Sequence, residues 1–305
     1  MILKHKTPVN IPAKRCLYLV VQFLICSSFV GAQTKEISIY KGIAPGSETW
    51  NWQERKSDTA NPLKLAFTYN VSKPTLIPVY PETGTANGSA VIICMGGSLT
   101  VLPIDRGLEI AKDLASKGVT AFVLKYRLAH SATTDPYTEW DKLYKENPAL
   151  REELIKPIWP LALNDLKNAI ILLKTNAGSY GIDSARIGVI GISAGSKLTA
   201  NLAYDYDGQT RPAFLGLMSI DMSNVKRTTL KEDTPPVFIA AAADDKLDVI
   251  PASLEFYNEW LRNKHQAELH LYVKGTHFLW EFPATDWVSR LVAWMQSLGF
   301  CQKNK

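Results

Sequence analysis

A serine between two glycines is the first feature of this chain that could do chemistry. The stretch 187–196 reads as an apolar strand, then Gly191-Ile-Ser193-Ala-Gly195, then the start of a run compatible with a helix. A serine with this spacing on a sharp strand-to-helix turn is presented to a substrate as a nucleophile. Glycine suits both flanking positions because the backbones of strand and helix pass very close there. Ser193 is therefore a candidate nucleophile, provided that the chain also supplies a base, an acid and an oxyanion hole.

The base that a serine needs is an imidazole, and one of the five histidines has a suitable position. His277 follows the predicted strand 268–273 in a loop that contains Gly275. Of the others, His5 lies in the first residues and His130 in a polar region. His265 follows a predicted helix, and His270 lies within a predicted strand. Because the carboxyl ends of parallel strands meet at one edge of a sheet, we expect His277 near Ser193.

Candidates for the acid are three aspartates, Asp244, Asp245 and Asp248, which follow the predicted strand 236–243. A buried carboxylate would fix the tautomer of the imidazole and stabilise its cation. A run of carboxylates is also typical of a solvated loop or of the start of a helix, and the mechanism needs only one. The residues alone leave the choice among the three open.

An oxyanion hole could form at the turn Gly96-Gly97-Ser98, which follows the predicted strand 90–95. The backbone N–H groups of Gly97 and Ser98, together with that of Ala194, would hold the negative oxygen of a tetrahedral intermediate. Losing one such donor typically costs about 3 kcal/mol. Taken alone, the same residues predict only a tight turn.

Strands and helices alternate along most of the chain. Apolar runs predict strands at 90–95, 119–124, 187–191, 213–220 and 236–243, and alternating apolar residues predict one at 268–273. Helical spacing of apolar residues predicts helices at 104–117, 161–177, 251–264 and 285–298. Two further predicted strands, 64–71 and 75–80, are assigned to sheet edges because of Pro74 and Pro78. This alternation predicts an α/β fold with a doubly wound, mostly parallel sheet.

The first 32 residues differ from the rest of the chain. Four basic residues precede an apolar run at 16–26, and small residues ending in Ala32 follow, as in a secretory signal peptide. The apolar run is short for a membrane span, although an uncleaved anchor is the alternative. We therefore expect a protein that is secreted or periplasmic and does not bind a membrane once the signal is removed.

The remainder, residues 33–305, is predicted to form a single domain. Within it, residues 130–157 are rich in polar residues, Tyr, Trp and Pro and show no strand pattern. We interpret this region as an insertion over the sheet. It is either a packed lid or a surface whose aromatic residues, Tyr137, Trp140, Tyr144 and the nearby Trp159, face sugar rings.

The charge balance gives no case for a nucleic-acid partner. The formal net charge of +5 comes from 34 basic and 29 acidic residues, but four of the basic residues lie in residues 1–32, which leaves 30 against 29. Only two of the four cysteines, Cys94 and Cys301, lie outside that segment, and they form no C-x-x-C pair. Neither a metal site nor a cofactor is predicted, and the oligomeric state is left open.

Four motifs resemble secreted bacterial α/β hydrolases of the acetyl-xylan-esterase and feruloyl-esterase-like group, some members of which are labelled endo-1,4-beta-xylanases. They are Lys125-Tyr-Arg-Leu128, the stretch 187–195 around Ser193, Ala243-Asp-Asp-Lys-Leu247 and Lys274-Gly-Thr-His277, and the likeness spans residues 40–298. The resemblance implies the α/β-hydrolase fold. It also implies Ser193 as nucleophile, His277 as base and Asp245 as acid, with Gly97, Ser98 and Ala194 as oxyanion donors.

The function that the resemblance implies is hydrolysis of carboxylic esters. A secreted enzyme of this kind would remove short acyl groups, acetyl above all, from plant polysaccharide such as xylan, or from a small ester. The alternatives are a peptidase of the same fold and a non-catalytic carbohydrate-binding protein.

Two positions depart from the pattern of the group. Met95-Gly-Gly-Ser-Leu99 stands where the group has Pro-Gly-Gly-Gly-Tyr, and Ser196 stands where it has glycine. We expect Ser98 to restrict the oxyanion loop and Leu99 to remove an aromatic side chain from the pocket.

Overall fold

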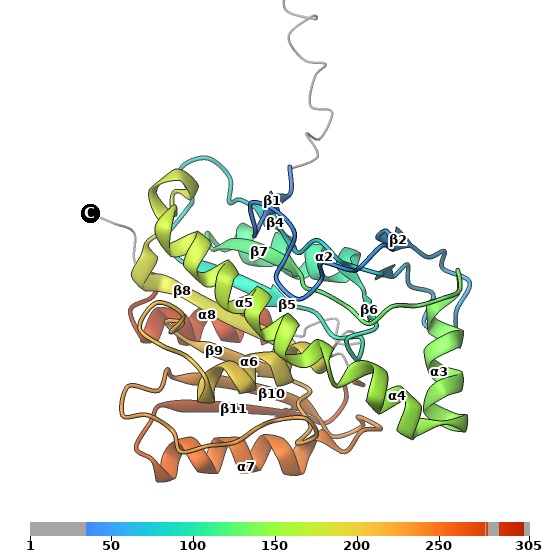
Figure 1. The fold of residues 1–305 in the computed structure, drawn as a ribbon. Helices are drawn as coiled ribbons and strands as arrows, with labels where there is room; N and C mark the ends of the chain where they lie inside the picture. Colours follow the sequence, from blue (N-terminus) through green and yellow to red (C-terminus); the bar gives the residue numbers. More distant parts are fainter. Residues whose placement is uncertain (1–34, 278, 280–286, 302–305) are drawn as a thin grey trace, which may run out of the picture. The chain divides into compact units, whose positions relative to one another are not determined.

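An eight-stranded sheet is the centre of the computed structural model, which describes residues 35–277, 279 and 287–301 (Figure 1). The predicted signal peptide lies outside the described residues, and Glu36–Lys305 form one unit by their contacts. In spatial order the strands are β1 (Ile37–Ser38), β4 (Thr75–Val79), β7 (Thr120–Lys125), β5 (Ala90–Cys94), β8 (Ile187–Ile192), β9 (Leu215–Met218), β10 (Val237–Ala242) and β11 (Ala267–Tyr272). Within this sheet, β4 runs in the direction opposite to the other seven strands. The prediction of a doubly wound, mostly parallel sheet is confirmed.

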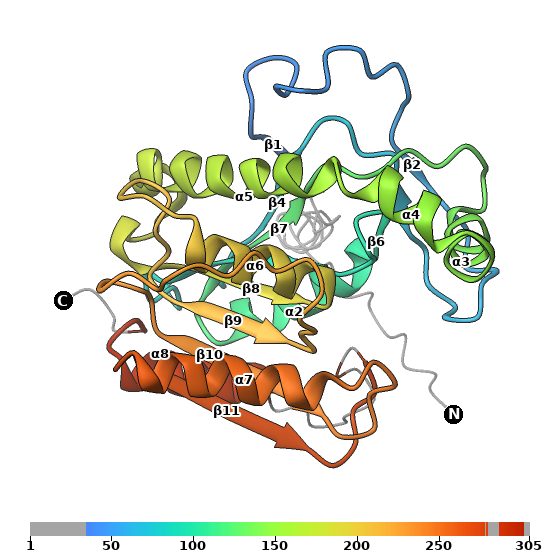
Figure 2. The same ribbon diagram turned by 60° about the horizontal axis from the view of Figure 1, so that its bottom comes forward.

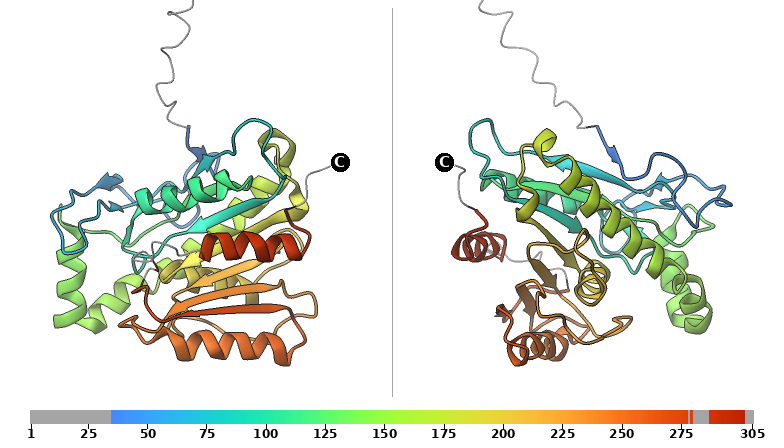
Figure 3. Two further views of the ribbon diagram at one scale, coloured as in Figure 1. Left: turned by 180° about the vertical axis from the view of Figure 1, so that it is seen from behind. Right: turned by 60° about the vertical axis from the view of Figure 1, so that its left-hand side comes forward.

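Helices cover both faces of this sheet. Every residue of β5, β7, β8 and β10 is buried, which explains why these strands read as continuous apolar runs. Helices α2 (Ile104–Ser116) and α8 (Trp287–Ser297) lie side by side on one face (Figure 3, left). Helices α5 (Ile158–Thr175), α6 (Ala194–Tyr204) and α7 (Val249–Arg262) lie on the opposite face, because the chain crosses the sheet there in the opposite direction. Two 3-10 helices, η1 (Ala177–Tyr180) and η2 (Ser184–Arg186), lead from α5 into β8.

The long helices agree with the predicted ranges to within a few residues, and residues 285–286 of the last one lie outside the described residues. Cys94 and Cys301 are both free thiols. Across the described ranges, none of the helices has the length and apolar character that a membrane span needs.

The prediction of an edge strand at 64–71 is wrong in extent and in position. Only Thr68–Tyr69 (β3) is a strand, and it belongs to a separate small sheet between β2 (Arg55–Lys56) and β6 (Val101–Leu102). The residues on either side, Lys64 and Asn70, have positive φ angles of 52° and 57°, which no continuous strand allows. Alternating apolar residues predict strand but carry no information on such local reversals.

The assignment of strand 75–80 to a sheet edge also needs correction. β4 is the second strand of the sheet, because β1 pairs with its first two residues, Thr75 and Leu76. Pro78 lies beyond that short pairing, so its missing N–H is tolerated as at an edge.

Two helices occupy the region 130–157. α3 (Pro136–Glu146) and α4 (Pro148–Ile155) each begin with a proline at the first helical position, behind a capping side chain. Asp135 accepts a hydrogen bond from the Thr138 amide, and Asn147 accepts one from the Leu150 amide. Figure 2 shows both helices on the side toward which the arrowheads of β9 and β11 point. The insertion therefore lies beyond the carboxyl ends of the strands.

A buried ion pair connects this sheet to α5 and to the segment between β1 and β4, which contains Tyr40 and Pro45. Arg127 follows β7 and is 1% exposed, and its guanidinium binds both carboxylate oxygens of the fully buried Asp165 on α5. Asp165 also accepts from the Arg127 amide and from the Tyr40 hydroxyl. Burial raises the pKa of Asp165, whereas the bonds from Arg127 oppose that shift. Arg127 Nη1 additionally donates to the carbonyl of Pro45 at 2.6 Å.

Asp165→Ala should lower the free energy of unfolding by about 3–5 kcal/mol, because it leaves a buried guanidinium without its anion. Urea denaturation measures this change. Asp205→Ala is the matched control, since Asp205 pairs with Lys167 at the surface and its loss should cost less than about 1 kcal/mol. Equal effects of the two substitutions would contradict the importance of the buried pair.

Candidate active site

Ser193 lies on a strained turn between β8 and α6. Its φ of 57° and ψ of −120° are outside the regions that non-glycine residues favour, and such strain is found mainly at functional sites. The flanking glycines have no space for a side chain. A Cβ on Gly195 would lie 1.8 Å from the carbonyl oxygen of Cys94, and one on Gly191 would lie 2.1 Å from the carbonyl oxygen of Gly195. The two glycines thus permit the close crossing that holds Ser193 in this conformation.

Ser196, which stands where the related group has glycine, supports the same turn. It is completely buried, and its hydroxyl lies 2.6 Å from the carbonyl oxygens of both Gly191 and Met218. The same oxygen accepts a hydrogen bond from the Met218 amide. The serine therefore ties the end of β8 to the end of β9.

Three side chains from three strand ends form one hydrogen-bonded chain. The Nε2 atom of His277, which follows β11, lies 2.7 Å from Ser193 Oγ. The Nδ1 atom of the same ring lies 2.8 Å from Oδ2 of Asp245, which follows β10. The Asp245 side chain is fully buried, and its other oxygen accepts from the Leu247 amide at 2.9 Å. This arrangement can deprotonate the serine hydroxyl and stabilise the imidazolium that results.

The other two aspartates near Asp245 make different contacts. Asp244 accepts a hydrogen bond from the Thr276 amide at 2.9 Å and so holds the loop that carries His277. Asp248 is exposed, has a φ of 49° and precedes α7 without a side-chain capping bond. The structure thus brings Asp245, and neither neighbour, into contact with the imidazole.

The described histidines other than His277 lie elsewhere. The rings of His130 and Trp52 are 4.6 Å apart, and His270 Nε2 lies 2.7 Å from Glu268. His265 lies just beyond the end of α7, and its amide donates to the carbonyl of Trp260. His5 lies outside the described residues.

The turn after β5 packs directly on the nucleophile. A Cβ on Gly96 would lie 2.7 Å from the Cβ of Ser193, so the two backbones are as close as they can be. Gly97 has a φ of 126°, and Ser98 and Leu99 have φ angles of 56° and 61°. Ser98 therefore adopts the left-handed conformation without being glycine, at the cost that a β-carbon brings there.

Leu99 does not have the role that its position in the sequence predicts. It is fully buried among the core residues and does not line the cavity. Leucine at this position therefore does not change the aromatic lining of the pocket. Its carbonyl accepts from the Ala129 amide at 2.8 Å. The left-handed turn directs its side chain into the core, and the sequence gives no sign of that reversal.

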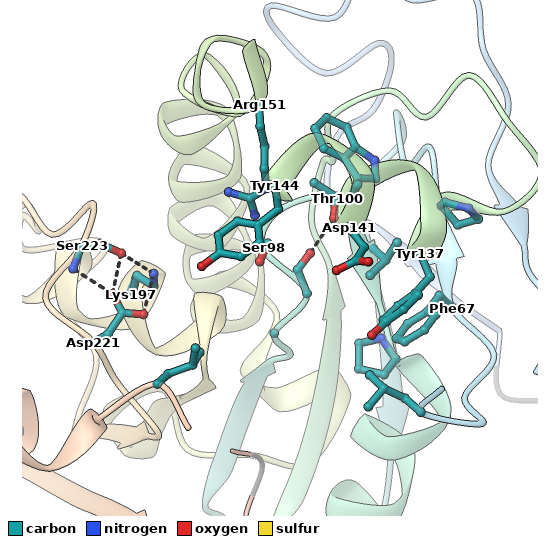
Figure 4. A pocket seen from close by; sticks show the side chains of 18 residues that line it. Phe67, Ser98, Thr100, Tyr137, Asp141, Tyr144, Arg151, Lys197, Asp221 and Ser223 are labelled. Atoms are coloured by element: carbon teal, nitrogen blue, oxygen red, sulfur yellow. Dashed lines mark hydrogen bonds and ion pairs between the residues drawn. The ribbon is translucent and has the colours of Figure 1, made fainter. Parts of the chain in front are cut away.

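A cavity of about 660 Å³ opens beside this turn (Figure 4). Its walls come from the turn itself, the small sheet, α3 and α4, the start of α6 and the loops after β9 and β10; they include Phe67, Gly96, Gly97, Ser98, Thr100, Tyr137, Trp140, Asp141, Tyr144, Arg151, Lys197, Asp221, Ser223 and Leu247. This volume is typical of a site for a small molecule. The region 130–157 is therefore a wall of the cavity that borders the turn Gly96–Ser98, and this turn packs on Ser193.

Some aromatic residues of that wall are packed in the protein, and others are exposed. Trp140 is buried, and its indole N–H donates to Ser131 Oγ at 2.7 Å. Tyr137 stacks on Phe67, with ring centroids 6.1 Å apart, whereas Tyr144 is 61% exposed. Trp159 belongs to α5 and is not among the lining residues. The two interpretations of the insertion, a packed lid and an aromatic surface, thus apply to different residues.

The charged lining residues were not found from the sequence. Lys197 Nζ lies 2.7 Å from both Asp221 Oδ2 and Ser223 Oγ (Figure 4). Burial raises the pKa of Asp221, but the bonds from Lys197 and Ser223 outweigh it and lower that pKa. These residues lie in loops or on a helix flank and match no motif. Across the part of the chain that the structure describes, no three His, Cys, Asp or Glu side chains are grouped to hold a metal ion.

Sequence comparison finds partial likeness to polysaccharide-acting proteins. The BD-FAE family matches residues 153–226, which include Ser193 but neither Asp245 nor His277. An acetylxylan esterase of Xylanibacter ruminicola is 22% identical over 245 residues, which are 69% of this chain and 45% of that protein. Endo-1,4-beta-xylanase B of Butyrivibrio fibrisolvens is 21% identical over 236 residues, 66% of this chain and 34% of that protein. The chain spans less than half the length of either relative.

Structural likeness extends over most of the chain. The acetyl ester-xyloside bifunctional hydrolase of Caldicellulosiruptor lactoaceticus superposes with a TM-score of 0.61 and 21% identity, covering 90% of this chain and 99% of that one. A carboxylesterase structure from Lactobacillus plantarum gives a TM-score of 0.58 and 19% identity, covering 85% and 100%. An α/β hydrolase from a deep-sea metagenome gives 0.55 and 21%, covering 81% and 97%. The predicted resemblance is thus confirmed, and the chain has the α/β-hydrolase fold.

Proposed function

We propose that this protein is a serine carboxylic ester hydrolase that works through an acyl-enzyme. One observation carries the proposal: His277 bonds Ser193 Oγ on one side and Asp245 on the other, at 2.7 and 2.8 Å. A nucleophile, a base and a group that orients the base, all within hydrogen-bond reach, are what acyl transfer through serine requires. The fold and the named relatives are consistent with this chemistry.

The reaction would proceed in two half-reactions. Ser193 Oγ attacks the ester carbonyl carbon while His277 Nε2 takes the hydroxyl proton, and a tetrahedral intermediate forms. Its bond to the alcohol oxygen then breaks, and the imidazolium gives the proton to that oxygen. Water next attacks the acyl-Ser193 ester with His277 again as base, which releases the carboxylic acid and restores the serine.

Asp245 would act through the imidazole. Its carboxylate accepts from the Leu247 amide and faces Nδ1 of His277, so it favours the tautomer whose Nε2 can accept the serine proton. Because the carboxylate is buried, it also interacts strongly with the positive charge that forms on the ring.

We assign the oxyanion hole to the backbone amides of Gly97, Ser98 and Ala194. Ala194 is the first residue of α6, and the first amides of a helix have no acceptor within the helix. The Gly96–Ser193 contact supports this assignment, because the turn that carries the other two amides packs against the nucleophile. Preset donors of this kind stabilise the oxygen that becomes negative in the intermediate.

The substrate class that we infer is acetylated plant polysaccharide, with xylan as the leading example. Support comes from the acetylxylan esterase and the acetyl ester-xyloside hydrolase among the relatives. The cavity also has the size for a sugar unit, and the exposed ring of Tyr144 offers it an apolar face. The basic and apolar character of residues 1–32 supports secretion.

Ser193→Ala should abolish ester hydrolysis, lowering kcat/KM by about 10⁴-fold or more, because no other group can form the acyl intermediate. Release of nitrophenol from 4-nitrophenyl acetate, and of acetate from acetylated xylan, measures the change. Circular dichroism controls for folding. Undiminished turnover in this variant would reject Ser193 as the nucleophile.

The same assays on the unsubstituted protein separate the alternatives. Preference for an aminoacyl anilide over acetyl and feruloyl esters would indicate a peptidase. Failure of a fluorophosphonate to label Ser193 would indicate a binding protein without catalysis.

Asp245→Asn should lower kcat about 10³- to 10⁴-fold, since the amide leaves the imidazole in the wrong tautomer. Asp248→Asn is the matched control, because Asp248 makes no capping bond and asparagine tolerates its left-handed backbone. We expect its kcat to remain within about twofold of the unsubstituted protein. If kcat fell strongly in Asp248→Asn and not in Asp245→Asn, the assignment of Asp245 as the acid would be wrong.

Gly96→Ala should slow ester hydrolysis by at least about tenfold, because the new Cβ would displace the turn and with it one oxyanion donor. Gly178→Ala is the control, since no atom lies within 4 Å of a Cβ built there. Steady-state kinetics with 4-nitrophenyl acetate compares the two. If both variants keep full activity, the turn after β5 does not form the oxyanion hole.

A further inference from the structure

The cavity holds one cationic side chain whose charge has no counterpart in the described part of the chain. Arg151 on α4 lines the cavity and is half-buried. Its guanidinium carbon lies 5.5 Å from the ring centroid of Tyr144 (Figure 4). The Nε atom is buried and has no hydrogen-bond partner, and no described carboxylate lies within ion-pair distance of this guanidinium.

The other charges of the cavity wall are matched. Lys197 pairs with Asp221 at 2.7 Å, and Asp141 pairs with Lys145 at 2.7 Å. Among the described lining residues, the charge left over is therefore the positive charge of Arg151. Burial lowers the pKa of this guanidinium, with Glu152 acting in the opposite sense, but arginine stays protonated at neutral pH.

An unpaired cation that is partly removed from water is costly unless a ligand restores its partner. The planar guanidinium matches a carboxylate with two parallel hydrogen bonds, which makes such pairs both strong and specific. The guanidinium lies over the ring of Tyr144, within the distance of a cation–π contact. The same cavity borders the turn at Gly96–Ser98, which packs on Ser193, so an ester held at Ser193 has Arg151 on the wall of the adjoining cavity.

We propose that Arg151 binds a carboxylate carried by the ester substrate. This inference rests on the proposed ester hydrolysis and narrows its substrate class to acidic esters. The carboxylate belongs either to the acyl half, as in a half-ester of a dicarboxylic acid, or to the alcohol half, as in an acetylated sugar acid. Both present the same group to the guanidinium.

Two pairs of substrates, each matched in size, test the proposal. The acyl pair is 4-nitrophenyl hydrogen succinate and 4-nitrophenyl butyrate, and the alcohol pair is acetylated glucuronic acid and acetylated glucose. The measured quantity is the preference, which is kcat/KM for the acidic member divided by kcat/KM for the neutral member. We expect the unsubstituted protein to prefer the acidic member of one pair, and added salt to reduce that preference.

Arg151→Gln should reduce the preference about ten- to hundredfold, since hydrogen bonds to a charged group are lost. Arg151→Lys should recover part of it, because an ammonium keeps the charge but not the paired geometry. Lys142→Gln is the matched control: it removes a positive charge from the exposed face of α3, outside the cavity, and should leave the preference within about twofold.

Each outcome has a distinct meaning. If the unsubstituted protein hydrolyses the neutral esters but shows no preference in either pair, the inference at Arg151 is wrong and the proposed function stands. If Arg151→Gln lowers both members of a pair equally, Arg151 only shapes the wall and the inference is again wrong. Absence of hydrolysis with every ester rejects the proposed function and this inference together.

Discussion

The close approach of two backbones at the centre of the sheet is the constraint on which the site depends. Gly195 at the start of α6 lies against the carbonyl of Cys94 at the end of β5, and Gly96 lies against Ser193 itself. Neither contact leaves space for a β-carbon. The turn that we assign to the oxyanion hole and the turn that carries the nucleophile are consequently fixed relative to each other by main-chain packing, without any side chain between them.

The segment Lys125–Leu128, which begins at the last residue of β7, supports the surroundings of that contact. The hydroxyl of Tyr126 donates to the carbonyl of Met95 at 2.5 Å and so anchors the start of the turn after β5. Arg127 binds Asp165 and ties α5 to the sheet. Desolvation lowers the pKa of Lys125, but bonds to Glu54 and Glu36 outweigh it and raise that pKa. One short motif thus connects the nucleophile's neighbour, a covering helix and the first residues of the fold.

Much of this arrangement could be predicted from the sequence because its signals are strong and local. Buried parallel strands are continuous apolar runs, and Ser193 and Asp245 each follow one of them, whereas His277 follows β11, an edge strand with alternating apolar residues. Positive φ angles at non-glycine residues have no comparable signal in the sequence. The extent of β3 was therefore predicted wrongly, and so was the place of Leu99, whose side chain is buried in the core. The caps Asp135-Pro136 and Asn147-Pro148 do predict helix starts, and they would have revealed α3 and α4. The cavity wall itself could not be predicted, since Phe67, Arg151 and Lys197 meet only through the folding of distant segments.

The two consecutive aspartates after β10 have one more consequence. Asp244 binds the backbone of Thr276 and Asp245 binds the ring of His277, so two neighbouring residues of one loop contact two neighbouring residues of the other. A single contact would set a distance and leave the imidazole free to swing about it. Two contacts, one to main chain and one to side chain, also restrict that rotation. The imidazole is then aimed at Ser193 before any substrate arrives.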